Sequence, residues 1–137
     1  MRSDEAMADP ERSIEDLIRS DGRYPPEAYA FLHEGLARAV KAAHGEEAQA
    51  GPAQHHVTGQ QLCLALRDLA TERWGLLARA VLGKWSIRST LDFGNMVYVL
   101  IRHNFMKKTE GDSIDDFRDA YDFSTAFDAG SQFELKE

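Results

Sequence analysis

The sequence predicts a mainly α-helical fold of the α+β class, with an N-terminal helical hairpin packed on a winged-helix-like three-helix unit that carries a short β-hairpin. Two observations support this prediction. Apolar residues recur at helical spacing in five segments, each bounded by a capping or turn signal. Two short segments with the character of strands, 105–108 and 114–118, then flank 109–113, a stretch rich in turn formers. Three helices followed by a two-stranded hairpin is the order of elements in a winged helix.

The chain of 137 residues is expected to form one domain at 13–127. Residues 1–12 lack apolar periodicity and are expected to be disordered, and 128–137 to be a flexible tail. Inside the domain we expect, in order, the helical hairpin at 13–44, a linker at 45–56, the winged-helix-like unit at 57–118 and an acidic aromatic segment at 119–127.

The helical hairpin is predicted from its end signals. Ser13 and Asp16 resemble a capping box at the start of a short helix, and Gly22 is placed to end it. Pro26 suits the first turn of a second helix, which should run to about His44. Both helices carry one apolar stripe, so each has a face to bury.

The three-helix unit begins with a second capping box, Thr58 with Gln61. Trp74-Gly75 should end that helix, and a shorter one should follow to about Trp85. Ser89 can cap the third helix, which should stop at Asn104, a residue type that tolerates the left-handed conformation.

The third helix is predicted to bury one face and expose another. Its buried stripe should contain Phe93, Val97, Leu100 and Ile101. Its exposed positions should include Asn95, Met96, Tyr98, Val99, Arg102 and His103. After it, 105–108 is predicted to be the first strand of the hairpin, and 114–118 the returning strand.

Charge is unevenly distributed along the chain. Residues 57–108 contain three acids against eight bases, whereas 109–137 contain nine acids against two bases, within a net charge of −7. This predicts a basic body followed by an acidic tail. The candidate surface for a partner or for nucleic acid consists of Arg79, Lys84, Arg88, Asn95, Met96, Tyr98, Arg102, Lys107 and Lys108.

The acidic segment also carries spaced aromatic residues. We expect them to dock on the same molecule and complete the core, while the neighbouring acids screen the basic face. The candidate docking residues are Phe117, Tyr121, Phe123 and Phe127. A tail that can leave would compete with an anionic ligand.

Several classes of function lack support in the sequence. Cys63 is the single cysteine, so neither an intramolecular disulfide nor a cysteine-only zinc site is expected. The first residues do not resemble a secretory signal, and no apolar run is long enough for a membrane span. No phosphate loop, nucleophile elbow or metal-ligand cluster is present, so no catalytic, cofactor or metal site is predicted. The expected location is the cytoplasm.

Four motifs resemble a known family. They are RYPPEAYAFLHEGL (Arg23–Leu36), HVTGQQL (His56–Leu62), IRSTLDFG (Ile87–Gly94) and DFRDAYDF (Asp116–Phe123). Together they are similar to a family of small conserved hypothetical proteins of planctomycetes and verrucomicrobia. The resemblance implies one compact domain of about this length and no activity. It also implies a glycine where this chain has Ser86.

Two functions remain open from the sequence. The first is a non-enzymatic protein-interaction or adaptor module, because the third helix has more apolar residues than one face can bury. The second is a nucleic-acid-binding regulator that uses the winged helix, with the acidic tail masking the basic face. Asp92, Glu110 and Asp112 would repel phosphate, which favours the first. The oligomeric state is not predicted.

Overall fold

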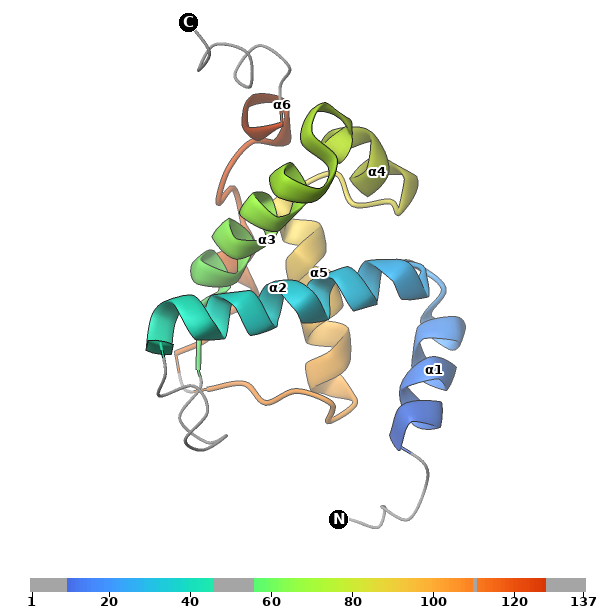
Figure 1. Ribbon diagram of the computed structural model, residues 1–137. Coiled ribbons are helices and arrows are strands. Elements are labelled where there is room, and N and C mark those ends of the chain that lie inside the picture. Colours follow the sequence, from blue (N-terminus) through green and yellow to red (C-terminus); the bar gives the residue numbers. More distant parts are fainter. Residues whose placement is uncertain (1–9, 46–55, 110, 128–137) are drawn as a thin grey trace, which may run out of the picture.

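The computed structural model describes residues 10–45, 56–109 and 111–127 of the chain. Over these ranges the protein is mainly helical (Figure 1). The elements are, in order, α1 (Pro10–Asp21), α2 (Pro26–His44), α3 (Gly59–Trp74), the 3-10 helix η3 (Gly75–Leu77), α4 (Ala78–Lys84), α5 (Thr90–Arg102), the 3-10 helix η4 (Ile114–Phe117) and α6 (Phe123–Ala126).

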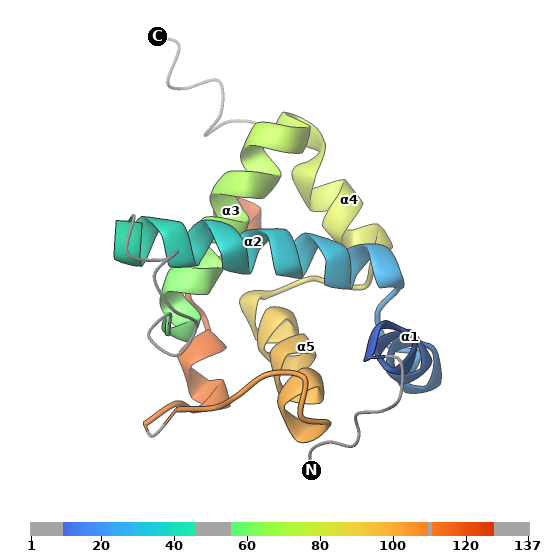
Figure 2. The ribbon, with the colours of Figure 1, turned by 60° about the horizontal axis from the view of Figure 1, so that its bottom comes forward.

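Helix α2 lies across the molecule, with α3 and α5 behind it (Figures 1 and 2). Helix α4 folds back from the end of α3, and α1 stands beside the first turn of α2. After α5 the chain passes beneath α2 and then rises beside α3 to end in α6, near the α3–α4 corner. The C-terminal segment therefore wraps around the helices that precede it.

One hydrophobic core joins the α-helices and η4. Its fully buried side chains include Leu66 of α3, Leu82 of α4, and Phe93 and Met96 of α5. Phe31 of α2 packs against the rings of both tryptophans and of Phe93, with centroid distances of 5.2 to 6.5 Å. Because α5 supplies residues to this core along most of its length, it is the central helix of the fold.

The predicted signals for the helix ends agree with the structure at most positions. Gly22 follows α1 with a positive φ of 70°, and Gly75 follows α3 with a φ of 55°. Thr58 caps α3, because its hydroxyl accepts from the Gln61 N–H at 3.0 Å and the Gln61 side chain accepts from the Thr58 N–H at 2.8 Å. Helix α1 starts at Pro10, however, so the predicted start at Ser13 and the predicted disorder of 10–12 are wrong.

Helices α4 and α5 end in the same hydrogen-bonded turn. After α4, the Ser86 N–H donates to the Gly83 carbonyl and the Ile87 N–H to the Leu82 carbonyl, both at 2.9 Å. Ser86 has a φ of 69°, and Ile87 and Leu82 are both buried. This is a Schellman motif with its apolar contact. Asn104, with a φ of 67°, occupies the equivalent position after α5, where the sequence predicted the stop.

Replacing Ser86 with glycine is expected to raise the free energy of unfolding by about 0.5–1 kcal/mol, because glycine adopts the left-handed conformation without steric cost. Ser86→Ala keeps the Cβ and should give no such gain. Urea unfolding of both variants would measure the difference. An equal effect of the two substitutions would show that the backbone at position 86 is not strained.

The predicted β-hairpin is not found in the residues that the structure describes. Residues 105–109 have no regular secondary structure, and 114–117 form η4 in place of the returning strand. Ser113 starts η4, because its hydroxyl accepts from the Asp115 N–H and its own N–H donates to Asp116 Oδ2, both at 3.1 Å. These caps favour a helical turn over an extended strand. Among the described residues after α5 there is therefore no strand that could form a wing.

Three expectations lie partly or wholly outside the described ranges. They concern disorder at 1–9, the linker at 46–55 and the flexible tail at 128–137. Within the described ranges, no helix combines the length and apolar character needed to cross a membrane.

Candidate functional site

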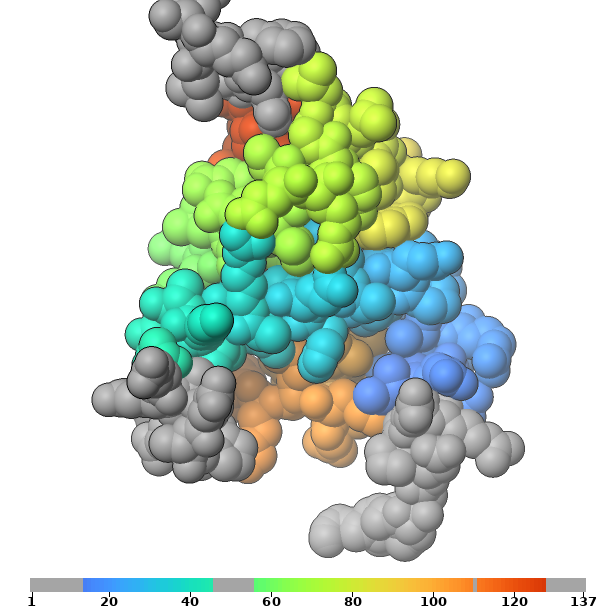
Figure 3. Space-filling view, in the orientation of Figure 1, coloured from blue at the N-terminus to red at the C-terminus, as the bar shows by residue number. Residues whose placement is uncertain are grey.

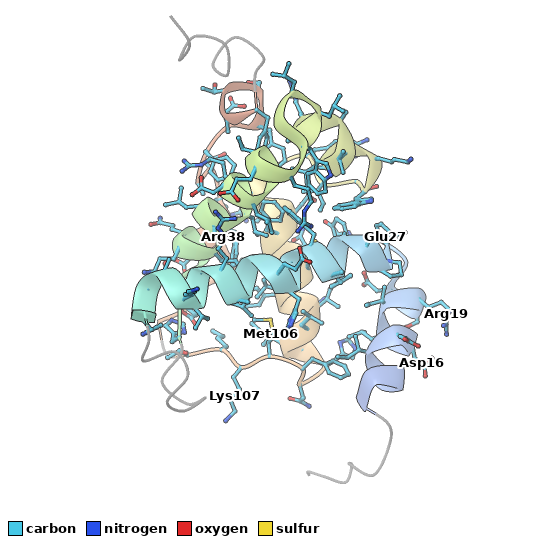
Figure 4. The ribbon with its side chains drawn as sticks, in the orientation of Figure 1. Asp16, Arg19, Glu27, Arg38, Met106 and Lys107 are labelled. Atoms are coloured by element: carbon cyan, nitrogen blue, oxygen red, sulfur yellow. The ribbon has the colours of Figure 1, made fainter. Side chains whose placement is uncertain are left out.

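The predicted basic side chains are exposed but do not share one surface. Arg79 and Lys84 belong to α4, at the opposite end of the molecule from Lys107, which points away from the body beneath α2 (Figures 1 and 4). Arg88, Arg102 and Lys108 are also exposed. A duplex would need several of these charges along one path. Their separation weakens the case for a phosphate-binding face.

The predicted exposed face of α5 is largely covered. Met96 and Val99 are almost completely buried, with exposed fractions of 0% and 1%, and Tyr98 is half-buried. The prediction that Met96 and Val99 lie on an exposed face is therefore wrong. The reason is that η4 packs on α5, while Phe31 of α2 meets Phe93 of α5 in the core. A recognition helix needs an open face to enter the major groove, and α5 does not offer one.

Asn95 has a structural partner, because its amide donates to the Tyr24 hydroxyl at 3.3 Å. The same hydroxyl donates to Asp92 Oδ1 at 2.6 Å, while Asp92 Oδ2 accepts the N–H groups of Arg88 and Ser89. Burial, followed by the bond to Asp92, raises the pKa of Tyr24 to about 12. This network fastens the turn between α1 and α2 to the first turn of α5.

The predicted docking residues of the C-terminal segment lie in or beside the core. Phe117, Phe123 and Phe127 are buried, and Tyr121 is half-buried and stacks on Phe123 with a centroid distance of 5.9 Å. The Tyr121 hydroxyl donates to the Cys63 carbonyl of α3 at 2.8 Å. These aromatic side chains complete the core between α3 and α5.

Phe117 occupies a slot between two glycines. A Cβ at Gly94 of α5 would lie 2.7 Å from Phe117 Cγ, and one at Gly59 of α3 would lie 3.0 Å from Phe117 Cε2. The buried residue Thr90 holds the backbone beside this slot through two hydrogen bonds. Its hydroxyl donates to the Phe117 carbonyl at 2.6 Å and accepts from the Ala120 N–H at 3.1 Å. The segment is thereby fixed against α5.

The C-terminal segment forms one wall of a groove beneath α2. The groove has a volume of about 360 Å³, within the range of about 300–1,000 Å³ that is usual for binding sites. Its floor is apolar and comes from α2, α3, α5 and Met106, which lies beneath α2 in Figure 4. Its rim is polar and includes His56, Tyr98, Lys107, Thr109, Asp112 and Asp116.

A polar clasp, formed by His56, Thr109 and Asp112, closes one end of this groove. The Thr109 hydroxyl oxygen lies 3.0 Å from His56 Nδ1, and His56 Nε2 lies 3.3 Å from Asp112 Oδ1. The Thr109 N–H donates to Asp112 Oδ2 at 2.8 Å, and His44 Nε2 lies 2.7 Å from the His56 carbonyl oxygen. The clasp thus joins the end of α2, the start of α3 and the C-terminal segment.

The clasp has the order hydroxyl, imidazole, carboxylate, which in hydrolases activates a nucleophile. Here both carboxylate oxygens of Asp112 are already bonded, one to the imidazole and one to the Thr109 backbone. His56 is exposed, with 42% of its side-chain surface accessible, so water surrounds the group. These contacts cross-link distant segments of the chain.

The carboxylates on one side of the rim contribute to a raised pKa at Tyr98. Burial, with the charges of Asp112 and Asp116 adding to it, raises the pKa of the Tyr98 hydroxyl. The phenol therefore keeps its proton and stays a hydrogen-bond donor beside two carboxylates. Asp112 and Asp116 give this side of the groove its negative character.

The sequence predicted Tyr98 and Lys107 as surface residues, but it did not predict the clasp. Thr109 and Asp112 have the spacing of a capping box, T-x-x-D, within a stretch that was interpreted only as a turn. His56 is 56 residues away from Asp112, so no local pattern could connect them. The floor of the groove could not be predicted from the sequence either, because it depends on how α2 lies over α5.

Buried tyrosines make the stability of the fold sensitive to alkaline pH. Burial raises the pKa of Tyr24 and Tyr29 from 10 to about 12, and raises that of Tyr121 as well. An unfolded tyrosine loses its proton near pH 10, whereas the folded one keeps it, so unfolding releases protons and stability falls as pH rises from 10 to 12.

We expect the free energy of unfolding to fall by about 1.4 kcal/mol per pH unit for each such tyrosine, with no loss from them below pH 9. Urea unfolding at pH 8 to 11.5 would measure the slope. Tyr29→Phe should remove the contribution of Tyr29 to this dependence of the free energy of unfolding on pH. A slope that is unchanged in this variant would show that Tyr29 ionises normally in the folded protein.

Within the described ranges, no three His, Cys, Asp or Glu side chains gather as metal ligands would. Comparisons of the chain with protein families, curated proteins and solved structures found no match. The groove beneath α2 is therefore interpreted from its own chemistry.

Proposed function

We propose that the protein is a non-enzymatic interaction module that holds a segment of a partner protein in the groove beneath α2. The observation that carries the proposal is the combination of an apolar floor with a polar rim in a groove of about 360 Å³. Protein interfaces commonly have this arrangement, because the centre gains from burial while the rim stays hydrated.

The chemistry of the rim indicates the kind of segment that would fit. Asp112 and Asp116 lie on the side of Tyr98, and the protein as a whole has a net charge of −7. A segment with one or two large apolar side chains and a neighbouring lysine or arginine would match the floor and this acidic side. Lys107 lies at the rim of the groove, and its positive charge would disfavour a lysine or arginine of the partner beside it.

The proposal can be tested by site-specific cross-linking in cells. A photoreactive benzophenone amino acid in place of Lys107 would sit at the rim of the groove, and the same amino acid in place of Leu77 would serve as control. Leu77 is a large exposed apolar residue at the α3–α4 corner, with an exposed fraction of 64%. We expect one discrete adduct from position 107 and none of the same mass from position 77.

A groove variant completes the test. Val40 is half-buried and lines the groove, so Val40→Glu places a charge against the floor. This substitution should abolish the adduct at position 107, whereas Leu77→Glu should leave it unchanged. If the adduct forms only from position 77 and is lost in Leu77→Glu, the interaction site is the α3–α4 corner and the groove proposal is wrong.

Nucleic-acid binding stays an untested prediction. It would use Arg88, Lys107 and Lys108, which are exposed. A fluorescence titration with duplex DNA and RNA at low salt tests it. Binding that disappears when these three residues are changed to glutamate would favour a nucleic-acid-binding regulator over an interaction module. Membership of the planctomycete and verrucomicrobial family likewise stays a prediction, based on the four motifs.

A further inference from the structure

The segment that follows α5 crosses the underside of the molecule as a strap, residues 105–109. In Figure 2 it runs from the end of α5 towards η4, and in the space-filling view the orange surface around it lies directly below α2 (Figure 3). It has no regular secondary structure. Met106, Lys107 and Thr109 line the groove beneath α2, called the partner groove from here on. The strap is therefore one wall of the proposed binding site.

The strap is held at its two ends and not between them. At its start, two backbone N–H groups donate to the Leu100 carbonyl of α5, at 2.8 and 3.3 Å. At its far end, Thr109 belongs to the clasp. Lys107 and Lys108 are exposed, and neither has a hydrogen bond or ion pair within the described ranges. Segments with so few contacts open locally at a low cost in free energy.

A residue with a left-handed backbone lies on each side of the strap. Asn104, before it, has a φ of 67°, and Gly111, after it, has a φ of 95°. Hinges commonly consist of a few residues at the ends of elements, which absorb a change in backbone torsion angles. A Cβ built on Gly111 would meet no atom within 4 Å, so nothing packs against the chain there. These two positions can serve as the hinges of the strap.

Met106 is the part of the strap that reaches the core. Its side chain points towards α2, whereas Lys107 points away from the body (Figure 4). Met106 is half-buried and lines both the partner groove and a second apolar space of about 480 Å³ between α1, α2 and the end of α5. The two spaces also share Leu36, Leu62 and Val97. The flexible side chain of methionine suits a plug between them that can leave and return.

The clasp and the strap together restrict entry to the partner groove. A chain segment that lies along a groove must leave it at both ends, and the clasp closes one of them. His56 in the clasp has 42% of its side-chain surface accessible, so water can replace its hydrogen bonds when the clasp opens. Opening of the clasp would also free the far end of the strap.

We propose that the strap is a gate of the partner groove. When the clasp opens, the strap swings about Asn104 and Gly111, withdraws Met106 and exposes the floor to a partner segment, over which it then closes. This regulation rests on the proposed function for what enters the groove. The opening itself belongs to the free protein and can be measured without a partner.

Thiol labelling of the floor measures the opening. Val97→Cys places a thiol at a position of α5 that is 5% exposed and lines both spaces. The natural Cys63 is the reference in the same molecule, because it is fully buried and lines neither space, and burial raises its pKa to about 12. Iodoacetamide at pH 8 followed by mass spectrometry gives the rate at each thiol. We expect slow labelling at position 97 and slower labelling at Cys63.

Breaking the clasp should accelerate labelling at the floor alone. In the Val97→Cys background, Asp112→Ala should raise the rate at position 97 at least tenfold and leave the rate at Cys63 unchanged. Asp115→Ala is the matched control, because it removes the same charge from an exposed side chain that bonds to Arg118 and does not line the groove. The control should stay within twofold. His56→Ala breaks the clasp from its other side and should repeat the effect of Asp112→Ala.

Three results would overturn the gate. The first is labelling at position 97 with the clasp intact that is as fast as labelling of Lys108→Cys, because the floor would then be uncovered. The second is an unchanged rate in both clasp variants. The third is an equal rise at Cys63 in both, because the whole fold would then be opening. Labelling as expected without an adduct at position 107 would refute the partner and leave the movement of the strap established.

Discussion

Replacing Gly94 with alanine is expected to lower the free energy of unfolding by about 3 kcal/mol. The new Cβ would lie 2.7 Å from Cγ and 2.8 Å from Cβ of Phe117. These atoms belong to the base of the Phe117 side chain, so a rotation of the ring cannot relieve the overlap. Thr90 holds the Phe117 carbonyl, which prevents the backbone from moving away without losing a buried hydrogen bond.

Gly83→Ala is the matched control for Gly94→Ala. Gly83 is also helical, lies in α4, and has no atom within 4 Å of a Cβ built on it. Alanine there should raise the free energy of unfolding by about 0.5–1 kcal/mol through helix propensity alone. Urea unfolding gives both values. If Gly94→Ala were also stabilising, Phe117 would not be seated on Gly94.

Gly35→Ala is expected to be at least as destabilising, by about 3 kcal/mol, because Gly35 is where α2 crosses α3. A Cβ at Gly35 would overlap Leu66 Cδ2 and lie 2.8 Å from Leu66 Cγ. Leu66 is fully buried, and a close-packed core resists movement of its side chain. Two ion pairs hold the helices at the same crossing, Arg38 with Glu72 and Arg73 with Glu34.

The double variant provides the sharper test at this crossing. Leu66→Ala alone should cost about 2–5 kcal/mol, because it leaves a cavity. It also removes the two Leu66 atoms that would lie within 3 Å of the new Cβ at position 35, so the double variant should be more stable than the sum of the two single effects by more than about 1 kcal/mol. Additive effects would show that α2 and α3 do not meet at Gly35 and Leu66.

The helices were predictable because their signals are local. Thr58 with Gln61, Gly75 and Asn104 each mark an end within one turn of the chain, and each has that role in the structure. Ser86 likewise ends its helix in the left-handed conformation, which glycine adopts without steric cost. Such signals operate before tertiary packing and are therefore visible in one sequence.

The region after α5 was predicted wrongly because two local signals compete there. Short candidate strands around turn formers favour a hairpin, but Ser113 and Asp116 have the same S-x-x-D spacing as Ser89 and Asp92, which start α5. The helical signal prevails because η4 places Phe117 between Gly59 and Gly94. That slot joins three distant parts of the chain, so the sequence alone could not reveal it.

The candidate site was less predictable than the fold for the same reason. The basic side chains are exposed, but their separation over the molecule depends on the tertiary arrangement and could not be predicted from the sequence. The apolar residues Met96 and Val99 were assigned to a surface, whereas the segments on both sides of α5 bury them. A groove made from α2, α5 and the C-terminal segment has no counterpart in any single stretch of sequence.

Hydrogen exchange of the full chain, with and without the partner that is cross-linked at position 107, tests the partner groove most directly. We predict slower exchange in 97–109 and at the start of α3, which wall the groove, and unchanged exchange in α4. Protection confined to the α3–α4 corner at 74–85, with none around Met106, would contradict the account.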